Sequence, residues 1–105
     1  MTDALGQVAS LVRSKNAGPF WLTLDIFLPD RQTFDRVRLS PVTDPAVIAR
    51  LYGVDADQVR VFLVTEVLAI KISLPRPVTQ GSLEDRDMHA GQQYVPLLAL
   101  PILSP

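Results

Sequence analysis

The chain has 105 residues, of which 48% are hydrophobic and 20% charged, with a formal net charge of −1 and no cysteine. This length predicts a single domain over residues 1–105, and the lack of cysteine excludes disulfides, thiolate nucleophiles and cysteine metal sites. The balanced charge argues against nucleic-acid binding. The short apolar runs and the lack of a signal-peptide pattern argue against a membrane or secreted protein, so we expect a cytoplasmic one.

The first predicted elements are a short helix and a strand. Apolar residues recur at helical spacing at Leu5, Val8, Ala9, Leu11 and Val12, which predicts an amphipathic helix that ends in a turn over residues 14–19. A strand is predicted over residues 20–28. Because alternate side chains are mostly apolar on both of its faces, we expect this strand in the centre of a sheet.

Two helices are predicted in the middle of the chain. The first covers residues 31–39, with Phe34 and Val37 turned inward. The second has stronger signals, since Asp44 can cap it, Pro45 suits its first turn and Gly53 suits its exit. Its apolar face is expected to consist of Val47, Ile48, Leu51 and Tyr52.

The second half of the chain predicts strands. Residues 59–65 and 67–74 are two β-rich runs with a short break at Glu66. A long polar connection over residues 75–93 follows them.

The last segment, residues 94–103, is apolar but contains Pro96 and Pro101, which confines it to an edge strand or an extended tail. The whole order of elements predicts an α+β fold, an α/β sandwich. We expect a small ferredoxin-like or related open sheet with helices on one face.

The segment Arg13-Ser14-Lys15-Asn16-Ala17-Gly18 is the first candidate site. Glycine lets a backbone approach a ligand closely, while Arg13, Ser14 and Lys15 offer charge and hydrogen bonds to an anion. The segment is not a P-loop, because it lacks that spacing and follows a helix. A tight turn with solvated charges is the structural alternative.

Asp25 and Lys71 form the second candidate site, since each is a charge in the middle of an apolar strand. A buried charge needs a partner, so an ion pair between the two is the simplest expectation if their strands are adjacent. Such a pair has two interpretations. It takes part in binding or proton transfer, or it is a structural ion pair without a further role.

The connection over residues 75–93 is the third candidate, because so long a segment is usually functional or disordered. Its hydrogen-bonding side chains favour a ligand or partner loop, with Arg76, Gln80, Ser82, Gln92 and Gln93 as candidate contacts.

Asp85, Asp87 and His89 alternate within this connection, as ligands of zinc or manganese can. The pattern arises readily by chance, so no metal and no cofactor is expected. His89 is the only histidine and therefore the candidate general acid or base.

Several separate motifs together resemble a known family. They are Arg13-Ser14-Lys15-Asn16-Ala17-Gly18-Pro19-Phe20, Ile70-Lys71-Ile72-Ser73-Leu74-Pro75-Arg76-Pro77, and Gln80-Gly81-Ser82 through Asp85, Asp87 and His89 to Gln92-Gln93-Tyr94-Val95-Pro96-Leu97. Across nearly the whole chain, the sequence resembles a small bacterial and fungal family known as domain of unknown function 4387.

The resemblance implies no known activity, but it implies a setting. Members of the family look like companions of acyclic terpene utilization protein A-like proteins, encoded beside them or fused to them. A ferredoxin-like domain of that larger family has an Arg-Ser-Gly-Asp-Lys-Gly turn. Residues 13–18 are similar to this turn, but they lack the aspartate and the lysine is shifted.

Three hypotheses about function follow. The leading one is an accessory subunit that joins a larger partner acting on carboxylic acids or acyl-CoA thioesters, with residues 13–18 and 76–94 at the contact. A homo-oligomer is also considered. The first alternative is a stand-alone lyase or hydratase that uses Asp25, Lys71 and His89. The second is a small-anion binding module that uses Arg13, Lys15 and Arg76.

Overall fold

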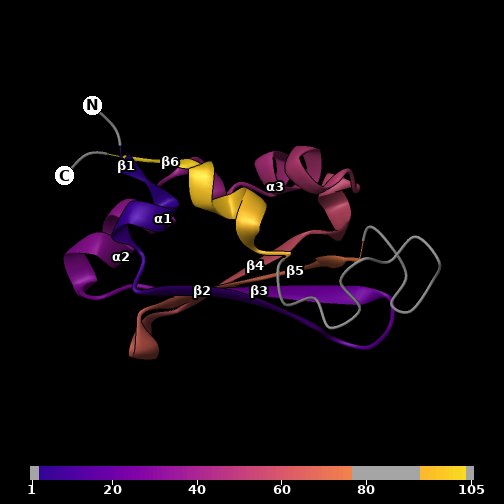
Figure 1. Ribbon diagram of the computed structural model, residues 1–105, viewed down its shortest axis with the longest axis horizontal. Helices are drawn as coiled ribbons and strands as arrows, with labels where there is room; N and C mark the ends of the chain where they lie inside the picture. Colours follow the sequence, from indigo (N-terminus) through magenta and orange to yellow (C-terminus); the bar gives the residue numbers. More distant parts are fainter. Residues whose placement is uncertain (1–2, 77–92, 104–105) are drawn as a thin grey trace.

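Four antiparallel strands in the order β2-β3-β5-β4 form the main sheet of the computed structural model, which describes residues 3–76 and 93–103 (Figure 1). The strands are β2 (Leu11–Asn16), β3 (Trp21–Phe27), β4 (Arg60–Val64) and β5 (Ala69–Pro75). The central strand predicted over residues 20–28 is confirmed as β3, which pairs with β2 on one side and β5 on the other.

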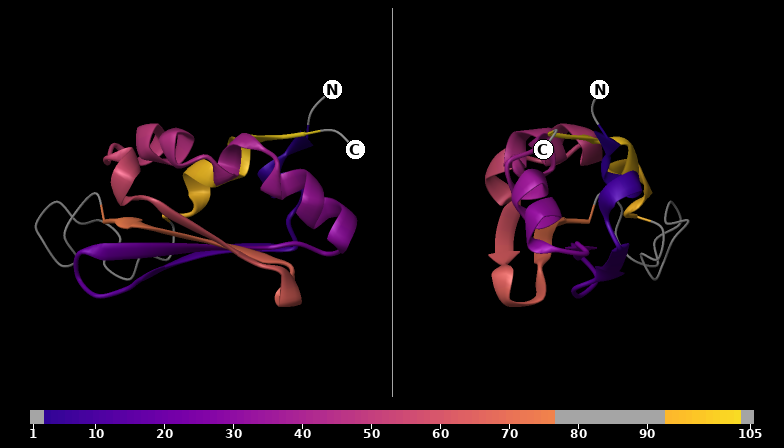
Figure 2. Two further views of the ribbon diagram at one scale, coloured as in Figure 1. Left: turned by 180° about the vertical axis from the view of Figure 1, so that it is seen from behind. Right: turned by 90° about the vertical axis from the view of Figure 1, so that its left-hand side faces the viewer.

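The helices lie on one face of this sheet, as Figure 2 shows from two sides. We call them the helical layer: α1 (Leu5–Val8), α2 (Arg31–Arg38), α3 (Pro45–Tyr52) and the 3₁₀ turns η1 (Pro41–Thr43) and η4 (Val95–Ala99). Side chains of the two inner strands, β3 and β5, that face the helical layer are fully buried, among them Leu24, Ile26 and Ile72. The opposite side, which we call the open face, has no described helix or strand over it.

The predicted helices α2 and α3 are confirmed; the ends of α3 have the expected chemistry, and α2 has a cap that was not predicted. The Asp30 carboxylate accepts a hydrogen bond from the Thr33 N–H at 2.8 Å, and the Asp44 carboxylate accepts one from Ala46 N–H at 3.0 Å. Gly53 ends α3 with a φ of 70°, a left-handed conformation that costs glycine least.

The apolar faces of these helices differ in one detail from expectation. Phe34 and Val37 of α2 are buried as predicted, and so are Ile48 and Tyr52 of α3. Leu51 is instead 38% exposed, and Ala49 takes its place in the core. The face of α3 that packs on the core is thus turned toward Ala49 and away from Leu51, compared with the face that hydropathy alone favours.

The N-terminal helix is shorter than predicted. It ends at Val8, and residues 11–16 form the edge strand β2, not the last turn of a helix and a loop. Helical and strand periodicities are hard to separate in a short apolar run. The sheet decides here, because β2 pairs in register with β3 from Leu11↔Phe27 to Asn16↔Leu22.

The C-terminal segment folds in two pieces, so the prediction of one edge strand or extended tail is only partly right. η4 comes first, and β6 (Pro101–Ile102) then pairs antiparallel with β1 (Asp3–Ala4). Arg36 of α2 holds this small sheet, because its guanidinium donates to the Asp3 carboxylate at 2.8 Å and to the Leu103 carbonyl at 2.9 Å.

The connections give the sheet a defined topology. β5 lies antiparallel between β3 and β4, so β3 and β4 run parallel, and the chain crosses between them through α2 and α3. β4 and β5 are joined by the short turn η3 (Thr65–Val67), where the sequence predicted a break, and η2 (Ala56–Gln58) precedes β4. The edge strand β2 reaches β3 through a turn without a helix. An open sheet with helices on one face is therefore confirmed, while a ferredoxin-like topology is not shown.

Candidate functional site

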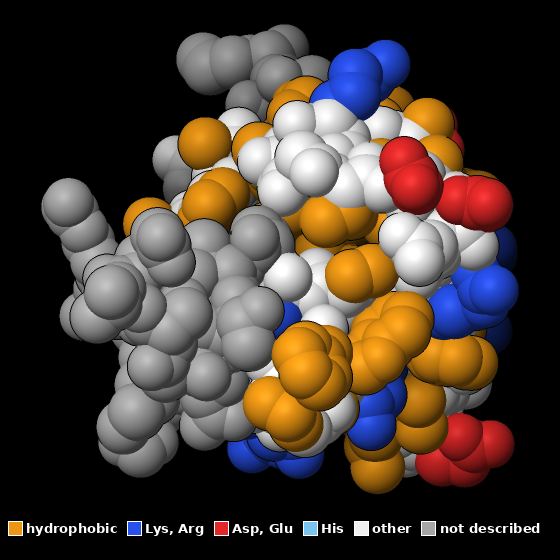
Figure 3. Space-filling view, turned by 90° about the vertical axis from the view of Figure 1, so that its right-hand side faces the viewer, with side chains coloured by type: hydrophobic (Ala, Val, Ile, Leu, Met, Phe, Trp, Pro, Cys, Tyr) orange, Lys and Arg blue, Asp and Glu red, His pale blue; other side chains and the backbone are white. Residues whose placement is uncertain are grey.

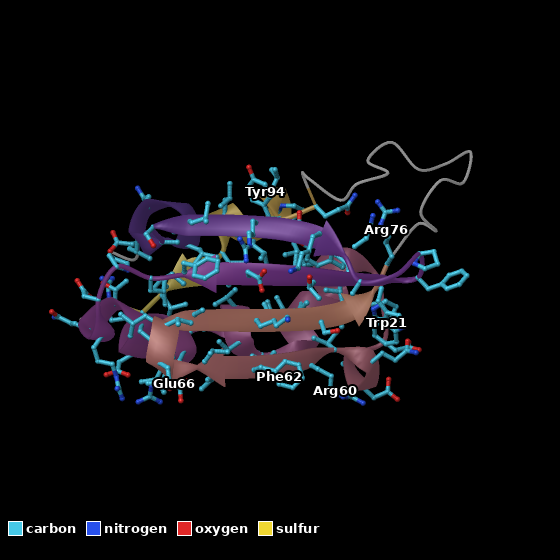
Figure 4. All side chains as sticks on the ribbon, turned by 90° about the horizontal axis from the view of Figure 1, so that it is seen from below. Trp21, Arg60, Phe62, Glu66, Arg76 and Tyr94 are labelled. Carbon is cyan, nitrogen blue, oxygen red and sulfur yellow. The ribbon has the colours of Figure 1, made fainter. Side chains whose placement is uncertain are left out.

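The centre of the open face is a row of charged side chains that crosses three strands. Arg13 of β2 lies opposite Asp25 of β3, and Asp25 lies opposite Lys71 of β5. The strands of Asp25 and Lys71 are thus adjacent, which is the condition on which the expected ion pair depended. Figure 4 views this face, with Phe62 of β4 at the end of the same row.

The ion pair of Asp25 differs from the expected one. The Arg13 Nε lies 3.2 Å from the Asp25 Oδ2, whereas among residues 3–76 and 93–103 no ion pair within 4.0 Å joins Asp25 to Lys71. The Asp25 side chain is 10% exposed and that of Arg13 52%. The Arg13 guanidinium also lies 5.0 Å from the centroid of the Phe27 ring, a cation–π contact that holds it over the strand.

The predicted anion-binding segment is divided between the two faces of the sheet. Because residues 11–16 form a strand, successive side chains point to opposite sides. Arg13 and Lys15 belong to the open face, whereas Ser14 and Asn16 face the helical layer. The segment therefore does not converge on one ligand in the way a loop would.

Gly18 lies in the turn between β2 and β3 with a φ of 82°, and no atom of the described residues lies within 4 Å of where a Cβ would be. Its freedom thus serves the turn itself. Beside it, Phe20 is 63% and Trp21 41% exposed, and Figure 3 shows hydrophobic side chains gathered at this end of the molecule.

A second polar group lies where the described chain leaves the sheet at Arg76 and resumes at Gln93. The Arg76 N–H donates to the Phe20 carbonyl at 2.7 Å, and Arg76 is only 7% exposed. The Ser14 hydroxyl accepts a hydrogen bond from the Tyr94 N–H at 3.1 Å. These contacts attach Arg76 to Phe20, next to β3, and Tyr94 to β2.

Tyr52 of α3 reaches the same region. Its hydroxyl donates to the Gln93 carbonyl at 2.5 Å, and burial raises the pKa of this phenol far above its ordinary value of 10.0. The phenol is therefore a neutral hydrogen-bond donor near pH 7, unsuited to act as a base. Periodicity placed Tyr52 in the apolar face of its helix and gave no signal for this polar contact.

A family model for a domain of unknown function, DUF4387, matches residues 5–101 of the chain. The chain belongs to the DUF4387 family. The resemblance drawn from the sequence motifs is thereby confirmed, and it covers every element from α1 to η4. Neither the curated proteins nor the solved structures contain a significant match.

Part of the predicted site of this DUF4387 domain lies outside the described residues: Gln80, Ser82, Asp85, Asp87, His89 and Gln92. Within residues 3–76 and 93–103, no group of three His, Cys, Asp or Glu side chains could hold a metal ion. In the same residues, no helix of the DUF4387 domain is long and apolar enough to cross a membrane.

The open face of the DUF4387 domain also contains exposed apolar residues that the site prediction missed. Leu11 and Phe62 are each 51% exposed, and both lie beside the charged row. Their position follows from strand alternation once residues 11–16 are assigned to a strand. Because Leu11 was assigned to a helix from the sequence, its position on the open face was not predicted.

Proposed function

We propose that this DUF4387 domain is a small accessory subunit that docks on a larger partner through the open face of its sheet. The family resemblance suggests an acyclic terpene utilization protein A-like partner, which acts on carboxylic acids or acyl-CoA thioesters. The proposal extends to this surface the contact that the sequence analysis assigned to residues 13–18 and 76–94.

The observation that carries the proposal is the distribution of charge. The chain has an overall charge of −1, and its only lysines are Lys15 and Lys71. Both lie on strands at positions that face away from the helical layer, together with Arg13. Asp25 is the acid among these side chains and is already paired with Arg13. The centre of the open face is therefore cationic on a chain that is anionic overall.

Such a surface fits a partner with an acidic patch. Complementary charge steers association and fixes orientation, and exposed apolar residues around it supply the buried area that binding needs. Leu11 and Phe62 are positioned to do so. An antiparallel sheet with one solvated face is common, but exposed large apolar side chains rimmed by polar ones are typical of interaction surfaces.

The alternatives have less support from the geometry. The small-anion module was expected to use Arg13, Lys15 and Arg76. Arg13 and Lys15 do share the open face, but Ser14 and Asn16, which would add hydrogen bonds to the anion, face the helical layer. The lyase or hydratase needs Asp25 as a free base beside Lys71 and His89, while Asp25 is held by Arg13 at 3.2 Å. Substrate turnover by the isolated chain, lost in Lys71→Met and in His89→Ala, would favour the enzyme.

The test is coexpression with the acyclic terpene utilization protein A-like protein from the same source, followed by native mass spectrometry. We expect a stoichiometric complex for the wild-type chain and for Arg50→Glu, which reverses an exposed charge on α3. Lys15→Glu reverses an exposed charge on the open face and should weaken the complex at least tenfold. A complex that is equally stable in both variants would contradict docking through this face.

A further inference from the structure

The edge strand β4 (Arg60–Val64) carries an inference beyond the proposed function. In the main sheet β4 pairs with β5 on one side, and among the described residues no strand pairs with its other side. Its side chains are open to solvent on both faces of the sheet: Phe62 is 51% and Leu63 49% exposed. The other edge strand, β2, differs, because it carries two charges, Arg13 and Lys15.

Edge strands of soluble proteins are normally protected against pairing by charges, proline or a bulge. β4 has the sequence Arg60-Val61-Phe62-Leu63-Val64, with one charge at its start and no proline or glycine. Its register with β5 runs without a bulge from Arg60↔Ser73 to Val64↔Ala69. A regular apolar edge of this kind is a template for another strand.

The arrangement of residues along β4 points to a second copy of this chain as the occupant. Figure 4 shows Arg60 at one end of the strand, Phe62 in the middle, and Glu66 of η3 beyond the other end. A twofold axis at Phe62 pairs two such strands antiparallel. It brings Phe62 opposite Phe62, Val61 opposite Leu63, and the Arg60 end of each copy beside the Glu66 end of the other.

This self-complementarity concerns both packing and charge. Aromatic and aliphatic pairs across antiparallel strands are favourable, and opposite charges at the ends select this register over a parallel one. Glu66 and Arg60 are both exposed, and neither forms an ion pair within the described chain.

We propose that β4 is a self-association edge, at which two copies pair antiparallel about Phe62 and join their sheets into one. The contact follows from the edge alone and does not require the accessory-subunit function. It also leaves Arg13, Lys15 and the centre of the open face accessible in each copy, and it shares only Phe62 with the surface proposed for the larger partner.

Analytical ultracentrifugation of the full chain over a range of concentrations is the first test. We expect a reversible monomer–dimer equilibrium. Arg60→Glu and Glu66→Arg each place like charges side by side and should raise the dimer dissociation constant roughly tenfold. The double variant Arg60→Glu/Glu66→Arg should restore it, while Lys15→Glu on the other edge strand should leave it unchanged. A chain that stays monomeric, or a double variant that is no better than the single ones, would overturn the proposal.

Disulfide trapping tests the register itself, because the natural chain has no cysteine. In the proposed pairing the two copies of residue 62 are directly opposite, with Cα atoms about 5 Å apart, whereas the Cα atoms of the two copies of residue 64 are about 14 Å apart. With diamide as the oxidant, Phe62→Cys should therefore form a covalent dimer and the matched control Val64→Cys should not. Equal trapping of both variants would overturn the antiparallel pairing about Phe62.

Discussion

Asp25 lies between two cations on the central strand, directly opposite Arg13 on one side and Lys71 on the other. Of these two cations, the Arg13 guanidinium is within ion-pair distance of Asp25 in the described chain, and Phe27 holds it in place. A carboxylate so placed stabilises the pairing of β2 with β3. Lys71 forms no ion pair with Asp25 and presents its ammonium group on the open face, as the proposed docking requires.

A double-mutant cycle separates the two cations. Asp25→Asn should lower the free energy of unfolding by about 1–2 kcal/mol, since it removes a charged hydrogen bond from a nearly buried site. The coupling energy between Arg13→Met and Asp25→Asn should be about 1 kcal/mol, and that between Lys71→Met and Asp25→Asn clearly smaller. Urea unfolding measures each value. A larger coupling to Lys71 would restore the pair that sequence alone suggested.

At the scale of single elements, α2 depends on its cap. The Asp30 carboxylate accepts hydrogen bonds from Thr33, chiefly from its backbone N–H, and these bonds lower the pKa of Asp30 below its ordinary value of 3.8. A carboxyl whose pKa is lower in the folded state stabilises the fold above its unfolded pKa. That contribution is lost as the pH falls through the folded pKa.

Asp30→Asn tests this linkage, because asparagine keeps the cap but cannot ionise. The wild-type chain should lose stability more steeply than the variant as the pH falls below about 4, and the two curves should run parallel above pH 6. Thermal unfolding midpoints across this range provide the measurement. Parallel curves at every pH would show that the charge of Asp30 does not contribute.

The elements differ in how well the sequence predicts them, and the reason is the range of the interactions that form them. α2 and α3 have local signals, Asp30 and Asp44 at their starts and Gly53 at an end, and they lie where expected. β2 has no such signal. Residues 11–16 form a strand because they pair with β3. The spacing of Leu11 and Val12 in the sequence fits the end of a short helix equally well.

The candidate site shows the same division. Asp25 and Lys71 were found because a charge inside an apolar strand is conspicuous in sequence. The pairing of Arg13 with Asp25 was not predicted, because Arg13 was assigned to a loop. In the structure Arg13 belongs to β2 and lies directly opposite Asp25. Tyr52 and Tyr94 were missed because their contacts are long-range: Tyr52 bonds the Gln93 backbone, and the Tyr94 backbone bonds Ser14.

On the scale of the whole molecule, one side of the sheet provides stability and the other remains available for binding. The helical layer buries the apolar side chains of β3 and β5, and the small sheet of β1 and β6 closes that layer. The open face and the edge of β4 take no part in this core. The fold thus presents two adjoining surfaces that share Phe62: the cationic open face, proposed to dock on a larger partner, and the edge of β4, proposed to pair with a second copy.

Lysine footprinting tests docking through the open face most directly, because Lys15 and Lys71 are the only lysines of the chain and both lie on that face. The acetylation rate of each would be measured by mass spectrometry in the free chain and in the complex with the acyclic terpene utilization protein A-like partner, against a lysine peptide as rate standard. We predict that the partner slows acetylation of both lysines at least tenfold. Unchanged rates in a complex that does form would contradict docking through the open face.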